Sequence, residues 1–471
     1  MFIAPQHQPE GFRRSRVWRA LTGSSLFLAA GLTGLVALGL FLANQILVTT
    51  PQGLYHRVWE TAGEQIYDPA TLGDWQQWEH KFDGQIHTNE DAIKFANEML
   101  KSAKDRYTYL LSPDMVADET QRSEGNFVGI GIVFDFNTDP NTGEPVLDSK
   151  GNPSPRTDAN GYPIIGKVMP GSPASSAGIK AGDAIATIDG TSAAGLTLEQ
   201  VVKMLRNKQG TTVNMSVVRD GSQLPPALLT RAPISMPAVT WKLLPGNIGY
   251  IQLHGFDQLD AIEEMEDAMK NLAGASSIIF DLRDNPGGFV HNSIGISSMF
   301  IREGTVVQIK NRIAGDRSNP QYETQTVKLE ADAMVLETER TDKPGKEVSR
   351  EKRTPYLLNG RPLVVLVNGN SASASELTAG ALKDNGFVVI GEKTFGKGIG
   401  QAVLLMPNGT MMHITSLRYL TPNGTWPGDG GNTVSHGIKP TTEVKMPGKN
   451  IEHGSERDSQ LKAAVELLQK Q

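Results

Sequence analysis

Two segments in the last third of the chain carry residue types that can form and break a covalent bond. The first, NGNSASASE (368–376), follows a buried-type apolar strand at Leu363–Val367 and runs into a helix pattern at about 375–383. It places serine hydroxyls at a helix start, where free N–H groups and the helix dipole favour a developing oxyanion. The second, TFGKG (394–398), sets Lys397 between glycines, which allow close approach to another segment.

A serine hydroxyl becomes a nucleophile only beside a base, and a lysine is a base only when it is neutral. An apolar, desolvated position lowers the pKa of a lysine by several units. Phe395 and Ile399 give Lys397 apolar neighbours in the sequence. Taken alone, the serine run also fits a helix N-cap, and the lysine also fits a solvated surface position. Their combination in one α/β segment favours a Ser/Lys pair.

Histidine is the competing base. His254, His291 and His413 all fall at the ends of expected strands, but nothing in the sequence pairs one of them with a serine, and the G-x-S-x-G elbow is absent. The H-E-x-x-H zinc motif is also absent. The chain has no cysteine, which excludes disulfides, thiolate metal sites and a cysteine nucleophile. We expect no metal and no cofactor. The net charge of −6 disfavours nucleic acid as a partner.

The elements around these segments alternate between strand and helix patterns. We expect strands at 248–253, 276–282 and 388–390, and helices at 257–272 and 455–470. This order predicts an α/β core with some parallel pairing. The charged, Pro- and Gly-rich stretch 314–355 is interpreted as an extended hairpin on the surface.

The N-terminal part has two different characters. Arginines at 13, 14, 16 and 19 precede an apolar, almost charge-free stretch at 20–48, which is long enough for one membrane crossing. Since arginines stay on the cytoplasmic side, we expect a single-pass anchor with everything after residue 49 extracytoplasmic, as in a bacterial periplasm. Residues 50–118 have helical periodicity.

Residues 125–220 consist of short apolar runs broken by turn residues. The polar segment 135–162 predicts a long hairpin or loop. Thr197 and Gln200 form a capping-box pattern for a helix at 198–207, and 212–219 alternates as a strand that ends in an Asp-Gly turn.

Together these segments closely resemble the C-terminal processing peptidases, the tail-specific protease family, over most of the chain after residue 50. The resemblance rests on motifs in a fixed order: DRYTYLL (105–111), GIGI (129–132), VMPGSPASSAGIKAGDAI (168–185), YIQL (250–253), DLRDNPGG (281–288), SASASE (371–376) and TFGKG (394–398). It implies a mixed α/β peptidase core with an inserted PDZ domain, an N-terminal helical region and a transmembrane helix. The expected boundaries are 1–49 for the anchor, 50–118 for the helical region, 119–231 for the PDZ domain, 232–450 for the peptidase core and 451–471 for a C-terminal helix.

The resemblance also implies roles for individual residues. Ser373 would be the nucleophile, Lys397 the general base and Gln401 the support of the lysine. The backbone N–H groups of Ala374 and of Gly287 or Gly288 would form the oxyanion hole. Ser373 and Lys397 are 24 positions apart, one fewer than the family pattern, and the missing residue falls in the loop at 384–388. This weakens any role for Asp384 beyond bracing that loop.

The PDZ resemblance implies capture of a C-terminal peptide as an added strand. The carboxylate would meet the loop formed by Gly129, Ile130, Gly131 and Ile132, and the helix at 198–205 would form the other wall. We therefore expect a serine endopeptidase that acts on proteins or peptides with apolar C-terminal tails. A general quality-control protease and a non-catalytic PDZ adaptor are the alternatives, and the sequence leaves self-association open.

Overall fold

The structure, a computed structural model, describes residues 50–123, 126–137, 146, 154–169, 171–235, 237–314, 317–448 and 453–470. The expected membrane anchor at 20–48 lies outside these residues. Within the ranges just given, no helix combines the length and apolar character that a membrane crossing requires.

The N-terminal helical region consists of helices α2 (Pro51–Gln65) and α3 (Asn89–Lys101), joined through the short 3-10 turns η2 (Pro69–Leu72) and η3 (Gln76–Trp78). The two helices pack on each other and on Met412 and Ile414 of strand β21 (Met411–Leu420). The expectation of helices here is confirmed. It missed one short strand, β1 (Tyr109–Leu111), which pairs with β21 and carries the chain toward the core.

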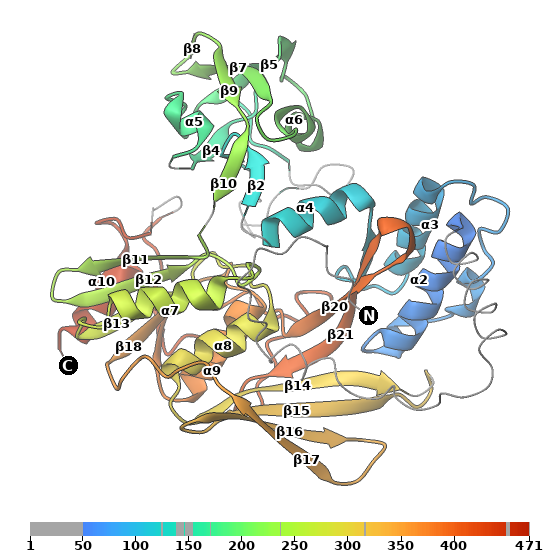
Figure 1. Ribbon diagram of the computed structural model, residues 1–471, viewed down its shortest axis with the longest axis vertical. Coiled ribbons are helices and arrows are strands. Elements are labelled where there is room, and N and C mark those ends of the chain that lie inside the picture. Colours follow the sequence, from blue (N-terminus) through green and yellow to red (C-terminus); the bar gives the residue numbers. More distant parts are fainter. Residues whose placement is uncertain are drawn as a thin grey trace, which may run out of the picture.

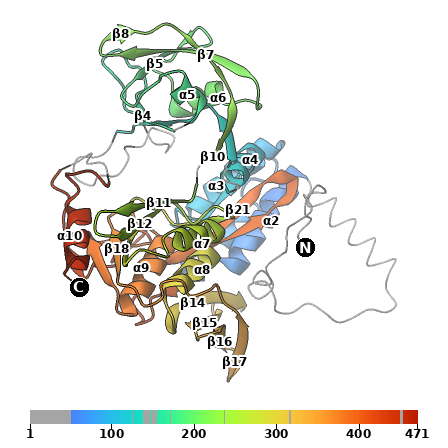
Figure 2. The ribbon, with the colours of Figure 1, turned by 60° about the vertical axis from the view of Figure 1, so that its left-hand side comes forward.

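Helix α4 (Pro113–Ser123) leads into a β-rich module that stands apart from the rest of the molecule (Figure 1, Figure 2). The module is joined to the rest of the protein through one antiparallel strand pair, β2 (Asn126–Gly129) with β10 (Ala232–Ser235). Its own apolar core includes Ile165, Ile185 and Val213. The predicted capping box of Thr197 and Gln200 is present, and the helix it starts ends at Leu205. The elements of the module are β3 (Ile132–Phe134), β4 (Ile165–Val168), α5 (Pro173–Ser176), β5 (Ala184–Ile188), β6 (Thr191–Ser192), α6 (Leu198–Leu205), β7 (Thr212–Arg219), β8 (Ser222–Gln223) and β9 (Ala227–Thr230).

The core is built on a six-stranded sheet in the order β11-β12-β13-β18-β19-β22. Only β11 runs antiparallel to its neighbour; the other four pairings are parallel, as expected. The central strands are buried on both faces, which explains their continuous apolar sequences. Phe280 and Val365 pack in the cluster formed with α7, α8 and α9, whereas Ile279 and Val364 pack in the cluster formed with α10. The elements are β11 (Val239–Leu244), β12 (Ile248–Leu253), α7 (Ala261–Asn271), β13 (Ser277–Asp281), α8 (Val290–Phe300), β18 (Leu363–Val367), α9 (Ala374–Asp384), β19 (Val388–Gly391), β22 (Thr442–Glu443) and α10 (Ser459–Leu468).

A second, antiparallel sheet runs in the order β1-β21-β14-β15-β16-β17, with β20 also paired to β21. Its outer strands confirm the expected excursion at 314–355, which forms consecutive hairpins at the bottom of Figure 1. The strands are β14 (Gly304–Ala314), β15 (Gln321–Leu329), β16 (Ala333–Arg340), β17 (Lys346–Lys352) and β20 (Ile399–Leu405).

Two expected helix starts are wrong for a physical reason. Helix α7 begins at Ala261, four residues later than expected, because Phe256 is held in an extended bridge with Gly288. Helix α10 begins at Ser459, because the carboxylate of Asp458 accepts the Leu461 N–H and caps the helix there.

Candidate active site

The carboxyl end of β18 turns sharply into α9, and Ser373 is the residue at the turn. Its φ of 55° and ψ of −116° lie in a region that side chains rarely adopt. A backbone hydrogen bond holds the turn in place: Ala372 N–H donates to the Asn285 carbonyl at 3.0 Å. The sharp turn leaves the Ser373 side chain partly exposed at the start of the helix.

The three serines of the run have different surroundings. Ser371 Oγ is buried and donates to the Leu282 carbonyl at 2.8 Å. Ser375 Oγ is also buried and donates to the Asn285 carbonyl at 2.8 Å. Ser373 takes part in a capping box with Glu376 at the start of α9, but no described residue accepts a hydrogen bond from Ser373 Oγ. Of the three hydroxyls, that of Ser373 is therefore the one available for chemistry, a distinction that the sequence alone did not give.

Lys397 lies two residues before β20 and is half-buried. Its Nζ donates to Gln401 Oε1 at 3.1 Å and lies 4.2 Å from the centre of the Tyr107 ring. Burial lowers the pKa of Lys397 to about 8, although the charges of Asp105 and Glu376 oppose the shift. With this pKa about a tenth of the lysine is neutral at pH 7, and the neutral form becomes the major one above pH 8. In the described chain, no hydrogen bond joins Nζ to Ser373 Oγ.

Gln401 is placed as expected beside the lysine. Its Nε2 donates to the Tyr107 carbonyl at 2.7 Å, which fixes the amide so that its oxygen faces Lys397. The Tyr107 hydroxyl in turn donates to the Gly430 carbonyl at 2.7 Å. Tyr107 therefore contributes its ring and its backbone to the lysine site. The motif DRYTYLL contains this residue, but the sequence alone indicated no role for it.

Glu376 is the residue that joins the two halves of the site. It is fully buried, and one oxygen, Oε2, accepts the backbone N–H groups of Ser373 at 2.9 Å and Lys397 at 2.7 Å. The other oxygen accepts Thr394 Oγ1 and Gly396 N–H. Burial raises the pKa of this carboxyl, and the four hydrogen bonds oppose that shift. The sequence analysis missed this role, although an S-x-x-E pattern at a helix start predicts a glutamate that reaches back to the cap.

Tyr419 makes a second connection between the same two segments. Its hydroxyl lies 2.7 Å from the Ser373 carbonyl and 2.5 Å from the Lys397 carbonyl. Burial raises the pKa of Tyr419 well above its ordinary value, so the phenol stays protonated and can donate. No local sequence pattern indicated this residue.

The glycine turn after β13 packs directly against the serine. A Cβ added to Gly287 would lie 2.8 Å from Ser373 Cβ and 2.9 Å from Ala374 N. The Gly287 N–H is already donated to Asn285 Oδ1 at 2.9 Å. By contrast, no described residue accepts the N–H of Gly288 or of Ala374. Between the two expected glycines, the hydrogen bonds favour Gly288 as the partner of Ala374 for a developing oxyanion.

The histidines considered as bases make other contacts. His254 Nε2 is 3.0 Å from Thr240 Oγ1, and the His291 ring stacks on Phe289. His413 stacks on Tyr109 and pairs with Glu119 at 3.1 Å. None of these contacts involves Ser373, whereas the backbone N–H groups of Lys397 and Ser373 share one oxygen of Glu376.

The loop where the chain is one residue short is compact. Helix α9 ends in a glycine cap, in which Phe387 N–H donates to the Leu382 carbonyl and Gly386, with φ of 92°, donates to the Lys383 carbonyl. Asp384 Oδ2 accepts Thr421 Oγ1 and Asn423 N–H. Asp384 thus braces a neighbouring turn.

In the β-rich module, the loop Gly129–Ile132 opens between β2 and β3. Gly131 has φ of 80°, and its carbonyl accepts the Met169 N–H at 2.9 Å. No described residue accepts the N–H groups of Ile130 and Gly131, which are the groups expected to meet a carboxylate. Ile130 packs in the same apolar cluster as Val201 and Leu205 of α6.

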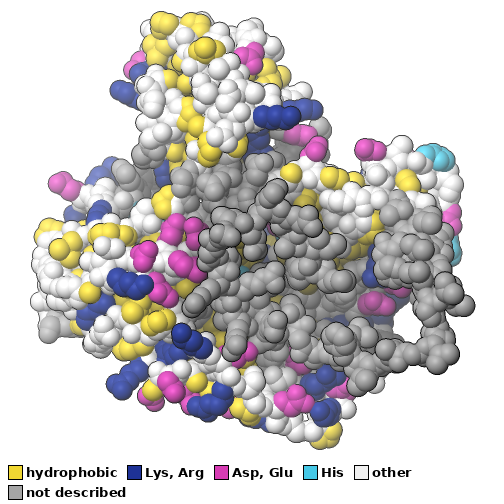
Figure 3. Space-filling model, in the orientation of Figure 1, with side chains coloured by type: hydrophobic (Ala, Val, Ile, Leu, Met, Phe, Trp, Pro, Cys, Tyr) yellow, Lys and Arg dark blue, Asp and Glu magenta, His cyan; other side chains and the backbone are white. Residues whose placement is uncertain are grey.

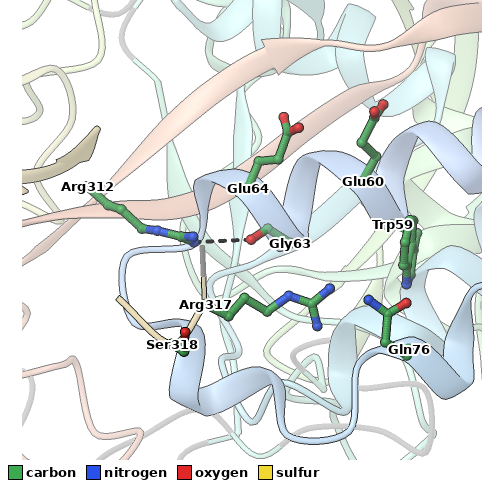
Figure 4. Close-up of a pocket in the computed structure, with 8 residues that line it drawn as sticks. All are labelled: Trp59, Glu60, Gly63, Glu64, Gln76, Arg312, Arg317 and Ser318. Atoms are coloured by element: carbon green, nitrogen blue, oxygen red, sulfur yellow. Dashed lines mark hydrogen bonds between the residues drawn. The ribbon is translucent and has the colours of Figure 1, made fainter. Parts of the chain in front are cut away.

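A cavity of about 560 Å³ lies elsewhere, beside α2 and η3. Figure 4 shows the side chain of Arg317 pointing toward Gln76 and Trp59 in this cavity, with Arg312 donating to the Gly63 carbonyl at 3.2 Å. Its lining includes neither Ser373 nor Lys397, so this cavity is not the candidate active site.

Comparisons with known proteins agree with this arrangement. Residues 247–444 match peptidase family S41, and residues 146–218 match the PDZ domain. The chain is 30% identical to a carboxyl-terminal-processing protease from Picosynechococcus sp. over 440 residues, which covers 90% of each protein. It is 29% identical over 437 residues to one from Synechocystis sp., covering 90% of this chain and 88% of the relative. Among solved structures, the photosystem II D1 C-terminal processing protease superposes with a TM-score of 0.51 at 24% identity, covering 84% of this chain and 94% of that one.

Proposed function

This chain belongs to the carboxyl-terminal-processing serine proteases of peptidase family S41, which carry a PDZ domain, and we propose that it cleaves proteins near their C-termini with Ser373 as nucleophile and Lys397 as general base. One observation carries the assignment of the pair. A single buried carboxylate oxygen, Glu376 Oε2, accepts the backbone N–H groups of both residues, so their backbones are adjacent although 24 positions separate them.

The proposed reaction starts with the neutral amine of Lys397, which takes the proton of the Ser373 hydroxyl as Oγ attacks the scissile carbonyl. The negative charge that develops on the carbonyl oxygen is met by the unpaired N–H groups of Ala374 and Gly288. Lys397 then gives its proton to the leaving amine. Water hydrolyses the acyl-enzyme by the same route, with Lys397 again as the base. Gln401 orients the amine throughout.

The PDZ module supplies tail recognition in this proposal. The free N–H groups of Ile130 and Gly131 receive the terminal carboxylate, and the tail adds as a strand beside Ile132. Helix α6 forms the other wall, and its apolar residues hold a hydrophobic last residue. The substrates are therefore proteins or peptides that end in an apolar, unstructured tail.

The test is cleavage of a peptide with an apolar C-terminus, followed by mass spectrometry of the products. We expect the Ser373→Ala and Lys397→Ala proteins to lose cleavage by about 10⁴-fold or more. The His254→Gln protein serves as the control and keeps its activity, because His254 hydrogen-bonds to Thr240 instead of to the serine. Full activity in the Ser373→Ala protein would contradict the assignment of Ser373 as the nucleophile.

Two alternatives differ from this proposal in what they predict. A non-catalytic adaptor leaves the peptide intact and does not react with a serine-directed probe, whereas the proposed enzyme is labelled at Ser373. A general quality-control protease cleaves peptides with free and amidated C-termini equally well. We expect the free terminus to be preferred.

We also propose that residues 20–48 anchor the chain and leave the catalytic part extracytoplasmic. The arginines before this stretch and its apolar length support the proposal. Recovery of the full chain in the membrane fraction, with the peptidase core accessible to an added protease only from outside, is the expected result. Recovery in the soluble fraction of the cell would contradict it.

A further inference from the structure

Three side chains of metal-binding type meet on the outside of the N-terminal helical region. His56 comes from α2, whereas His80 and Asp83 come from the segment that follows η3. Their donor atoms all lie within 4.8 Å of one another. His80 Nδ1 is 3.0 Å from Asp83 Oδ2, and His56 Nε2 is 3.8 Å from Asp83 Oδ1. Histidine side chains also stand out in Figure 3 at the edge of the molecule where α2 and α3 lie in Figure 1.

Two of these groups face one position, which the Gln52 side chain occupies: its Nε2 donates to Asp83 Oδ1 at 2.5 Å and lies 3.2 Å from His56 Nε2. His80 approaches the other oxygen of the same carboxylate. A carboxylate oxygen of Asp83 and a ring nitrogen of His56 thus face the same amide N–H group of Gln52. A metal cation in place of that group would meet both atoms. Gln52 precedes His56 by four residues on α2, so a turn of its amide presents Oε1 to that position as a fourth ligand.

Buried contacts in the apolar core of this region hold together the two segments that carry the ligands. Tyr55, next to His56, is fully buried, and its hydroxyl donates to the Trp78 carbonyl. The Tyr55 ring also packs edge-on against Phe82, next to Asp83, with ring centres 6.0 Å apart. The ligands are therefore positioned by the apolar core of the region, so that a metal ion finds a site that is largely built.

The donor set identifies the class of metal. Two imidazoles, one carboxylate and one amide oxygen suit a four-coordinate Zn²⁺. The hard cations Ca²⁺ and Mg²⁺ need about six oxygen ligands, and this cluster does not offer them. We propose that His56, His80 and Asp83, with Gln52, form a Zn²⁺ site that clamps α2 to the segment 76–84. The site is separate from the chemistry at Ser373.

The test uses the full chain, stripped of metal with a chelator and titrated with Zn²⁺ by calorimetry. We expect one equivalent to bind. The His80→Asn and Asp83→Asn proteins should bind at least about tenfold more weakly, since loss of a ligand costs no less than loss of an outer-shell partner. The His80 side chain is 71% exposed, so its replacement leaves the apolar core intact.

His87→Asn is the matched control, because His87 is exposed in the same region and lies outside the cluster. This variant should bind Zn²⁺ as the unmodified chain does. Two further readouts separate a built site from scattered surface binding. Zn²⁺ should raise the melting temperature of the unmodified and His87→Asn proteins but not of His80→Asn, and Co²⁺ should give the visible absorption of a tetrahedral site. Zn²⁺ binding that is unchanged in His80→Asn, or absent from the unmodified chain, overturns the proposal.

Discussion

The catalytic junction and the PDZ loop are built in opposite ways. At the junction, Glu376 and Tyr419 hold Ser373 and Lys397 by their backbones from within a buried core. The loop at Gly129–Ile132 belongs to a module with its own apolar cluster, joined to the rest through the β2–β10 pair. In the proposed function this contrast separates two tasks: several hydrogen bonds fix the geometry of the reaction, whereas tail recognition belongs to a module with its own core. Changes at the junction should lower the rate for every substrate, and changes in the loop should alter only which substrate is preferred.

The largest effect is expected when the base at position 397 is removed but its positive charge is kept. In the Lys397→Arg protein we expect kcat to fall about 10⁴-fold for all peptides, because a guanidinium stays protonated at any working pH. Single-turnover cleavage of a tailed peptide measures the fall. Lys393→Arg, on an exposed position of the same turn, is the control and keeps its rate. Retention of activity in Lys397→Arg would remove the lysine from the mechanism.

The glycine turn gives the next largest effect. Gly288 has φ of 142°, and an added Cβ would lie 2.2 Å from Asp257 N. We expect Gly288→Ala to shift the turn and lower kcat about 10³-fold, the scale of a lost oxyanion donor. Gly386→Ala, with φ of 92° and open space around it, shares the strain without the clash and should keep its rate. Equal losses in the two variants would mean that strain alone is responsible.

The Glu376→Gln protein tests the buried carboxylate that joins the serine turn to the lysine turn. The amide NH₂ would face backbone N–H donors, so we expect kcat to fall about 10²-fold and the free energy of unfolding to fall by about 2–3 kcal/mol. Urea denaturation and peptide kinetics measure the two losses. Glu443→Gln, on an exposed strand end, controls for loss of a charge. An unchanged kcat in Glu376→Gln would show that the site keeps its geometry without the carboxylate.

The pH dependence follows from the burial of Lys397. Since its pKa is lowered to about 8 and only the neutral amine is a base, kcat/KM should rise about tenfold per pH unit below that value and level off above it. The expected gain between pH 7 and pH 9 is about tenfold. A kcat/KM that stays constant from pH 6 upward would contradict a lysine base.

The smallest effect is expected in the loop of the PDZ module. A Cβ at Gly131 would lie 2.1 Å from Ser172 Cβ, so Gly131→Ala should distort the carboxylate loop. We expect KM for a free-ended tail to rise several-fold, up to about tenfold, with kcat for an amidated peptide unchanged. A parallel fall in kcat for both peptides would mean that the loop supports the chemistry as well.

The sequence predicted those parts of the fold in which the local pattern decides. The apolar run at Leu363–Val367 forms the expected strand, and Thr197 caps the expected helix. The site was predicted less completely, because its supports come from distant segments. Tyr107 and Tyr419 reach Lys397 from other strands and loops, and no spacing rule joins residues so far apart in the chain. The sequence alone gave no physical reason to choose Ser373 among the three serines. The structure gives one, because Ser371 and Ser375 are buried and hydrogen-bonded.

The shared carboxylate of Glu376 has a consequence for the newly made chain. Its oxygens accept from the serine turn and from the lysine turn, and the lysine turn also needs Tyr419 from β21. A chain that has not yet completed β21 has the Glu376 link but lacks the hydrogen bonds of the Tyr419 hydroxyl to the Ser373 and Lys397 carbonyls. With Ser373 and Lys397 in their proposed roles, the site therefore gains its full set of backbone hydrogen bonds only after β21 has joined the sheet, close to the end of chain synthesis.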